Sequence, residues 1–293
     1  MFVAATTIEE AYAHASKAEI LPALAPRIPA DLVATMPRLE WVHALTTGVD
    51  NLLMMPTLGA DIIITNSRGI HGLQMSELAI LQMLALARKF PEMLANQRQA
   101  KWERWPQPLL LDKTVCIVGL GVIAEALAAR CRAFGMRVTG VSNGRQEVDG
   151  FDRIYRRADL KAAASEADFL VVVVPYSQET HHLINAEIFE AMKPSAYFIN
   201  ISRDGCVDEV TLLAHLRAGQ IAGAALDVFE ATPLPTDSPL WSQPNLILTP
   251  QIGGMSDIYA RQALPIFISH LKAYAEGGAA ALQNRVNRSG KPL

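Results

Sequence analysis

The chain is poor in the residues that mark disulfide-bonded, metal-binding or nucleic-acid-binding proteins. It has three cysteines in 293 residues, and none of Cys116, Cys131 and Cys206 has a partner at the spacing of a metal or redox motif. Charged residues make up 19% of the chain and leave a formal net charge of -3, which gives no strongly basic surface for nucleic acid or an anionic membrane. We expect no metal ion, no nucleic-acid partner and no membrane partner.

Long apolar runs are also missing. The chain has no stretch of about 18 uncharged apolar residues, and its first residues lack the basic region, apolar core and cleavage site of a signal peptide. Hydrophobic residues nevertheless form 51% of the chain, as in a globular protein, and its length fits two domains. Because the scattered cysteines are typical of buried, reduced thiols, we expect a soluble cytoplasmic protein.

The middle of the chain contains a strand, a glycine turn, a helix and a second strand. The apolar run at 115–118 predicts a short strand, and apolar residues at helical spacing follow from 125 to 134. A second strand is expected at 137–141. An ordinary tight turn is the alternative explanation of the glycines, but the second strand follows at the distance of a βαβ unit and favours a dinucleotide-binding site.

Each residue of the glycine turn has an expected role in such a site. Gly119 permits the tight turn, and Gly121 lets a pyrophosphate approach the backbone. Val122 and Ile123 stand between the second glycine and the helix, whose N-terminus faces the phosphate charge. Ala124 stands where a third glycine is usual, and it is small enough for the helix to pack on the strand.

The end of the second strand predicts which cofactor binds. An NAD site normally has Asp or Glu about 20 residues after the glycines, where the carboxylate binds the adenosine ribose. This chain has no acid there, since Ser142 and Asn143 are followed by Gly144 and Arg145. Short polar side chains can hydrogen-bond a 2′-phosphate, and the planar fork of an arginine can pair with it. We favour NADP(H) and keep NAD(H) open, the alternative being an arginine in a solvated loop.

Strands and helices alternate along the chain, which predicts an α/β fold with a doubly wound parallel sheet. Four consecutive valines at 171–174 are typical of a strand buried on both faces. The longest helical pattern spans about 76–102, with Pro91 as a kink, and we expect it to be buried between domains or against a partner subunit. We assign 1–86 and 264–293 to a substrate domain and 87–263 to a dinucleotide-binding domain.

Three polar residues follow predicted strands, where the chemistry of a doubly wound sheet is located. They are Arg203, Asp227 and Gln251. Taken singly, a solvated charge at the strand end is the minority alternative for Arg203, and a helix cap is the minority alternative for Asp227. Because both stand at the tips of adjacent strands, their joint presence favours a site.

Several short motifs follow one another in the order in which one family carries them. They are Gly48-Val49-Asp50, Ser76-Glu77-Leu78, the glycine turn, 175–180, Met192-Lys193-Pro194, 200–208, 223–230 and 244–250. On these motifs the chain resembles the D-isomer-specific 2-hydroxyacid dehydrogenases, near the glyoxylate and hydroxypyruvate reductase branch. The resemblance implies a Rossmann-type cofactor domain and a smaller flavodoxin-like substrate domain. The family opens with a further strand and helix, so we expect the substrate domain to lack its first βα unit.

The resemblance also implies roles for individual residues. Gly48 and Val49 would offer amides to the carboxylate of a small 2-keto or 2-hydroxy acid, and Arg203 would clamp that carboxylate and the keto oxygen. Asp227 would hold the nicotinamide carboxamide, and Trp102 would reach a neighbouring active site, which implies a homodimer. The residues expected to line the cofactor are Gly119, Gly121, Val122, Ile123, Ser142, Asn143, Arg145, Pro175, Thr180, Ile201, Ser202, Asp227 and Gly253.

The chain departs from the family pattern at its catalytic positions. The family's general acid is a histidine after Thr-Pro, where this chain has Gln251, and the carboxylate that orients it is replaced by Thr232. Asp204 stands at a customary glycine. A glutamine cannot release a proton near pH 7. Water or another group such as His71 would then supply the proton, although a single loop histidine is more often incidental.

Three hypotheses follow for the function. The first is an NADP(H)-dependent reductase of a small 2-keto acid, slow or specific for an unusual substrate, with Arg203, Gln251 and Thr232 at its catalytic positions. The second is a cofactor-binding sensor or interaction protein with a retired active site, and the third is a nicotinamide enzyme with a different substrate class. We favour the reductase because a sensor has little need of the substrate arginine.

Overall fold

The computed structural model describes residues 2–287 and divides the chain into two compact units. Residues up to Ile70 and from Ser256 onward form the first unit, and His71–Met255 form the second. The boundaries expected from the sequence, after 86 and after 263, differ from this division. The reason is that helix α4 (Gly72–Ala87) packs against α6 (Val122–Ala133) and two strands of the second unit.

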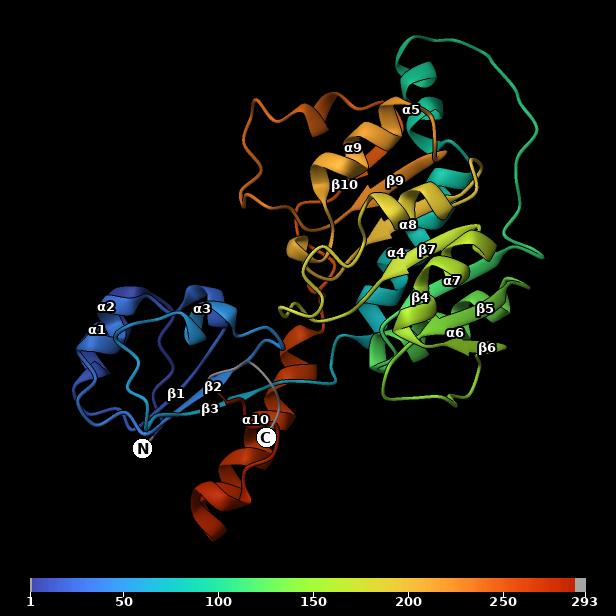
Figure 1. The fold of residues 1–293 in the computed structure, drawn as a ribbon. Coiled ribbons are helices and arrows are strands. Elements are labelled where there is room, and N and C mark those ends of the chain that lie inside the picture. The colour runs from blue at the N-terminus through green and yellow to red at the C-terminus, as the bar shows by residue number, and fades with distance from the viewer. Residues whose placement is uncertain (1, 288–293) are drawn as a thin grey trace. The chain divides into compact units, whose positions relative to one another are not determined.

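The first unit is built on a three-stranded parallel sheet in the order β1-β2-β3 (Figure 1). Its strands are β1 (Ile20–Ala23), β2 (Trp41–Ala44) and β3 (Ile63–Asn66). Its helices are α1 (Ile8–Ala15), α2 (Ala30–Ala34), α3 (Asp50–Leu53) and α10 (Tyr259–Gly277). Thr7 caps α1 in a reciprocal pair with Glu10, which stabilises the start of that helix.

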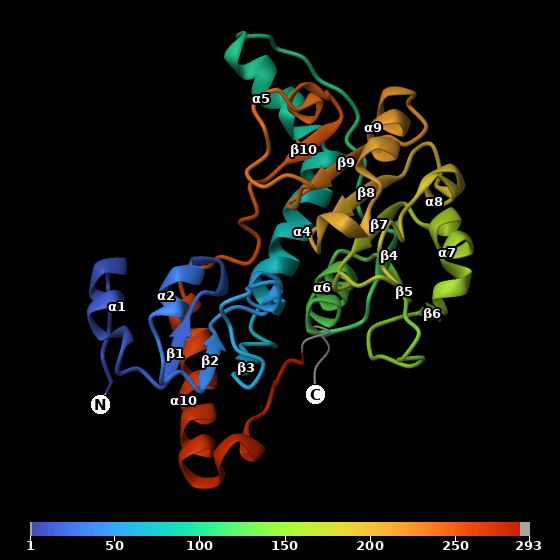
Figure 2. The same ribbon diagram turned by 60° about the vertical axis from the view of Figure 1, so that its left-hand side comes forward.

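The second unit is built on a seven-stranded sheet in the order β10-β9-β8-β7-β4-β5-β6, with every pair parallel (Figures 1 and 2). The strands are β4 (Thr114–Val118), β5 (Arg137–Val141), β6 (Arg153–Tyr155), β7 (Phe169–Val172), β8 (Tyr197–Asn200), β9 (Gly223–Leu226) and β10 (Leu246–Leu248). Besides α4 and α6, the helices are α5 (Phe90–Arg98), α7 (Leu160–Glu166), α8 (Ala186–Ala191) and α9 (Glu209–Arg217). This confirms the predicted α/β fold with a Rossmann-type parallel sheet.

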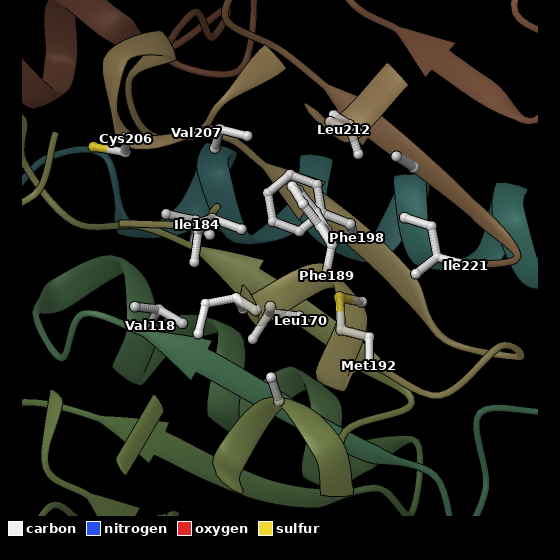
Figure 3. Close-up of a cluster of buried hydrophobic side chains, with 14 of the residues drawn as sticks. Val118, Leu170, Ile184, Phe189, Met192, Phe198, Cys206, Val207, Leu212 and Ile221 are labelled. Atoms are coloured by element: carbon white, nitrogen blue, oxygen red, sulfur yellow. The ribbon is translucent and has the colours of Figure 1, made fainter. Parts of the chain in front are cut away.

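The central strands bury side chains on both faces, as the valine run predicted. Val115 and Ile117 of β4 join the core formed with α4 and α6. Their neighbours Cys116 and Val118 point to the opposite core, formed with α7, α8 and α9, and Figure 3 shows part of this second core. Because side chains alternate along a strand, a sheet covered by helices on both faces needs apolar residues at every position.

The long helix expected from 76 to 102 is wrong, because the structure has two helices and an irregular segment there. α4 ends at Ala87, and Lys89 takes a left-handed conformation with φ 52°. Pro91 lies in the first turn of α5, where the missing N–H of proline costs no hydrogen bond. Proline therefore starts a second helix here instead of kinking the first one.

A buried histidine links the strands of the first unit. Hydrogen bonds join Trp41 Nε1 to Thr65 Oγ1 at 2.8 Å, Thr65 Oγ1 to His43 Nδ1 at 2.7 Å, and His43 Nε2 to Ser67 Oγ at 3.1 Å. The ring of His270 from α10 lies 5.2 Å from that of His43. Burial, together with the repulsion of a charge on His270, lowers the pKa of His43 to about 3. The imidazole is therefore neutral at neutral pH.

We predict that this histidine makes the first unit sensitive to acid. Because the pKa of His43 in the folded chain lies below its ordinary value of 6.5, the unfolded chain takes up the proton first, and stability falls as pH drops below about 6.5. For His43 alone the loss reaches about 2 kcal/mol by pH 5. Urea denaturation at neutral pH and at pH 5 should show a smaller acid-induced loss in His43→Gln than in the parent.

The matched control is His14→Gln, because His14 lies exposed on α1. This variant should lose as much stability between the two pH values as the parent does. Equal losses in His43→Gln and the parent would show that His43 is not responsible.

Candidate active site

The glycine turn follows β4 and has one closed and one open side. Gly119 has φ 99°, and a Cβ atom there would lie 3.0 Å from the backbone nitrogen of Val174. A Cβ atom on Gly121 would meet nothing within 4 Å. Gly121 is the N-cap of α6, so the open side of the turn exposes the positive end of a 12-residue helix. The open side of the turn therefore leaves room for an anionic group at the start of α6.

The tip of β5 is folded back toward this turn. Ser142 Oγ accepts hydrogen bonds from the backbone N–H groups of Gly144, at 3.2 Å, and Arg145, at 3.1 Å. Arg145 Nη1 forms an ion pair with the Glu125 carboxylate and lies 3.4 Å from the carbonyl oxygen of Leu120. The guanidinium thus lies beside the glycine turn.

Glu125 is a residue of this site that the sequence analysis missed. It lies in the first turn of α6, where the helix dipole favours a carboxylate, and both members of the pair are half-exposed. Asn143 is also engaged, since its Oδ1 accepts the backbone N–H of Arg157 at 3.1 Å. A sequence signal for Glu125 was available, because an acidic residue directly after Ala124 falls in the first turn of the predicted helix.

Asn200 shapes the segment that carries Arg203. Its Oδ1 accepts the Ser202 hydroxyl at 2.8 Å and the Ser202 N–H at 3.0 Å, while its Nδ2 donates to the Arg203 carbonyl at 3.0 Å. Arg203 Nη1 in turn donates to the Ser202 carbonyl at 2.8 Å. Asn200 thereby fixes the position of the arginine just beyond β8, with Ile201 buried in the core beneath it.

The loop after β7 is held by one threonine. The Thr180 hydroxyl donates to the Pro175 carbonyl at 2.8 Å and accepts the Ser177 N–H at 2.7 Å. Thr180 is 3% exposed, so its side chain supports the loop from inside, whereas Pro175 lies exposed at the end of the strand.

Asp227 organises the loop after β10. Its carboxylate accepts the Thr249 hydroxyl at 2.6 Å and the backbone N–H groups of Ile252 at 3.1 Å and Gly253 at 3.0 Å. The residue is 2% exposed, and this burial raises the pKa of its carboxyl group, while the three hydrogen bonds act in the opposite direction. Gln251 stands in the sequence between Thr249 and Ile252. It has a left-handed backbone with φ 55°, and it is exposed.

His71 lies against the same loop. A Cβ atom on Gly254 would be 3.4 Å from His71 Cδ2 and 3.6 Å from Nε2, so the imidazole packs on the Gly254 backbone. Gln74 lies in the first turn of α4. Its Nε2 donates to the Gly254 carbonyl at 3.4 Å. Burial and the positive charge of Arg203 lower the pKa of His71 to about 4. The second unit therefore gathers Arg203, His71 and the Asp227-held loop in one cluster.

The remaining predicted residues are Gly48 and Val49 in the first unit and Thr232 and Trp102 in the second. In the first unit, Thr46 Oγ1 donates to the Gly48 carbonyl at 2.8 Å, and Val49 is buried just before α3. In the second unit, the Thr232 hydroxyl donates to the Phe229 carbonyl at 3.3 Å. Trp102 follows α5 in an irregular segment and is 91% exposed.

Two further properties concern the described residues as a whole. Within residues 2–287, no cluster of three or more His, Cys, Asp and Glu side chains is placed to hold a metal ion. In the same range, no helix combines the length and apolar character needed to cross a membrane.

Comparison with known proteins assigns the chain to a family. The model of the D-isomer specific 2-hydroxyacid dehydrogenase NAD-binding domain matches residues 80–253. The chain belongs to this family. A glyoxylate/hydroxypyruvate reductase B of Shigella boydii is 34% identical over 254 residues, which are 84% of this chain and 78% of the relative.

Solved structures agree with the assignment. A family member from Aeromonas salmonicida is 37% identical and matches with a TM-score of 0.89 over 97% of this chain and 90% of its own. An NADPH-dependent glyoxylate/hydroxypyruvate reductase from Sinorhizobium meliloti, solved with NADP and sulfate, is 29% identical with a TM-score of 0.81 over 95% of this chain and 89% of its own.

The two glycines of the turn should respond differently to alanine. Gly119→Ala is expected to lower the free energy of unfolding by about 2 kcal/mol or more, because it combines a left-handed backbone with a clash against Val174. Gly121→Ala should cost less than about 1 kcal/mol, since its Cβ points into open space, yet it should weaken dinucleotide binding. Chemical denaturation and NADPH titration of both variants test this, and equal binding of NADPH by Gly121→Ala and the parent would contradict it.

Proposed function

We propose that the protein is an NADP(H)-dependent reductase of a small 2-keto acid of the glyoxylate or hydroxypyruvate type. The observation that carries the proposal is the cluster of Arg203, His71 and the Asp227-held loop beyond the strand ends of the second unit. A cation fixed there can bind a substrate carboxylate and stabilise the negative charge that develops on the keto oxygen. The reductases of Shigella boydii and Sinorhizobium meliloti support the substrate class.

The cofactor is assigned by the residues around the glycine turn. When bound, NADPH supplies the hydride that is added to the keto carbon. The amides of Gly121, Val122 and Ile123 would bind its pyrophosphate, and Arg145 its 2′-phosphate. Pro175, Ile201, Ser202 and Gly253 would line the nicotinamide half, with Asp227 toward the carboxamide and Thr180 supporting the loop from within.

A cofactor sensor with a retired active site is the second candidate. Gln251 and Thr232 favour it, because neither can complete the family's proton relay. Arg203 argues against it, since three hydrogen bonds of Asn200 shape the segment that carries a substrate cation.

A subunit interface is proposed on α5 and the segment after it. No residue of α5 is buried, and large apolar side chains are exposed along this stretch. They are Phe90, Leu94, Trp102, Leu109 and Leu111. Exposed apolar side chains along this stretch favour association, and we infer a homodimer. A monomeric mass in sedimentation equilibrium would refute it.

A cytoplasmic location is proposed from the thiols. Cys116, Cys131 and Cys206 are all free and buried, and burial raises the pKa of Cys116 and of Cys131 to about 12. Unreactive single thiols suit a reducing compartment. Fractionation that found the protein outside the cytoplasm would refute the proposal.

The reductase proposal predicts turnover that depends on Arg203. NADPH consumption should be measured with glyoxylate, hydroxypyruvate, pyruvate and bulkier 2-keto acids for the parent and for Arg203→Ala. The variant should lose about 10²-fold or more in kcat/KM, because a positioned cation stabilises the developing oxyanion. NADPH binding by the variant should remain, which separates the loss from unfolding. Binding of NADPH by the parent without turnover of any 2-keto acid would favour the sensor.

Substitutions in the Arg145–Glu125 pair should change the affinity for NADPH in opposite directions. Arg145→Ala should weaken NADPH binding about tenfold or more and leave NADH binding nearly unchanged, because only NADPH carries the 2′-phosphate. Glu125→Gln should tighten NADPH binding several-fold, since it removes the carboxylate that competes for the guanidinium.

The ion pair Arg132–Asp152 gives a matched control, because Arg132 also lies on α6 and pairs at 2.9 Å with similar exposure. Arg132→Ala should leave the ratio of the NADPH and NADH dissociation constants unchanged. If the ratio is equally unchanged in Arg145→Ala, the cofactor assignment is wrong.

A further inference from the structure

The reaction needs a proton as well as a hydride. Addition of hydride to the keto carbon moves the carbonyl π electrons onto the oxygen, which must then be protonated. Gln251 can donate a hydrogen bond but cannot release a proton near pH 7, and the same holds for the Thr232 hydroxyl. The acid of this enzyme therefore lies elsewhere, which is an inference that rests on the proposed reductase function.

His71 is a titratable group beside the loop that carries Gln251. Its imidazole packs on the backbone of Gly254, three residues after Gln251. It stands immediately before α4, and Gln74 in the first turn of that helix binds the Gly254 carbonyl. The imidazole is partly accessible, and it lies close enough to Arg203 for the guanidinium charge to act on it. These contacts all lie within the second unit.

We propose that His71 is the general acid of the reaction and protonates the substrate oxygen. As the O–H bond forms, an N–H bond of the imidazolium breaks and its electron pair stays on nitrogen, so His71 becomes neutral. Solvent returns the proton before the next turnover. In the reverse direction neutral His71 takes the hydroxyl proton of the 2-hydroxy acid.

Substrate binding is expected to charge the acid. The charged group that acts on His71 is Arg203, from just beyond the end of β8. Asp227, from just beyond the end of β9, accepts hydrogen bonds from the backbone N–H groups of Ile252 and Gly253, which directly precede Gly254. In the unliganded chain Arg203 disfavours a proton on His71. A substrate carboxylate paired with Arg203 neutralises that charge and removes one of the two causes that lower the pKa of His71, burial being the other, so the imidazole binds a proton more readily when the substrate anion is present.

The first test measures this proton without turnover. Imidazole resonances of the full chain with NADPH, assigned with His71→Gln, are followed by NMR during pH titration, with and without oxamate, a keto-acid analogue that is not reduced. The pKa of His71 should rise by about one unit or more with oxamate. No shift of the His71 resonances while oxamate binds would overturn the proposal. Failure of oxamate to bind at all would instead count against the proposed function.

The second test is kinetic. His71→Gln should lower kcat by about 10²-fold or more with little change in KM, and remove the ionisation of the acid from the pH profile. Adding Gln251→His to that variant should restore part of the rate, because a histidine then stands at the family's acid position. His14→Gln, on exposed α1, is the matched control and should retain the parent's kcat.

The outcomes separate a chemical from a structural role. A His71→Gln variant with the parent's kcat and pH profile would overturn the proposal. A lower kcat with an unchanged pH profile would do so too, because it would show that His71 only positions the loop at Gly254. A parent without turnover of any 2-keto acid would refute the reductase function itself.

Discussion

The buried Asp227 carboxylate holds the candidate active site together. A carboxylate that is 2% exposed is stable only if its oxygens accept hydrogen bonds, and here the donors come from Thr249, Ile252 and Gly253. Satisfying this one group therefore fixes the path of the whole loop. The left-handed backbone at Gln251 and the contact of Gly254 with His71 both follow from that path.

A second carboxylate balances the charge beside the glycine turn. The start of α6 and Arg145 place positive charge next to one another, and Glu125 compensates both. The Glu125 carboxylate thus holds the Arg145 guanidinium in place at the candidate cofactor site. Arg203 and His71 show the opposite case. Two basic side chains lie close together there, and only the arginine carries a charge at neutral pH.

The sequence predicted local structure well and tertiary contacts poorly. Apolar periodicity predicted β4 and β5, and the glycine spacing predicted the turn between β4 and α6, because these features depend on neighbouring residues. The split between α4 and α5 was missed, since the left-handed Lys89 leaves no trace in an apolar pattern. The pairing of Glu125 with Arg145 and the packing of His71 on Gly254 join distant parts of the chain, so no spacing rule contains them.

The two-sided burial of β4 also limits how this protein can change over evolutionary time. Val115 and Ile117 are committed to one core, and Cys116 and Val118 to the other. A substitution on such a strand disturbs packing before it alters chemistry. Substitutions are therefore tolerated more readily in the segments beyond the strand ends, where the candidate active site lies, while the packing of the sheet is preserved.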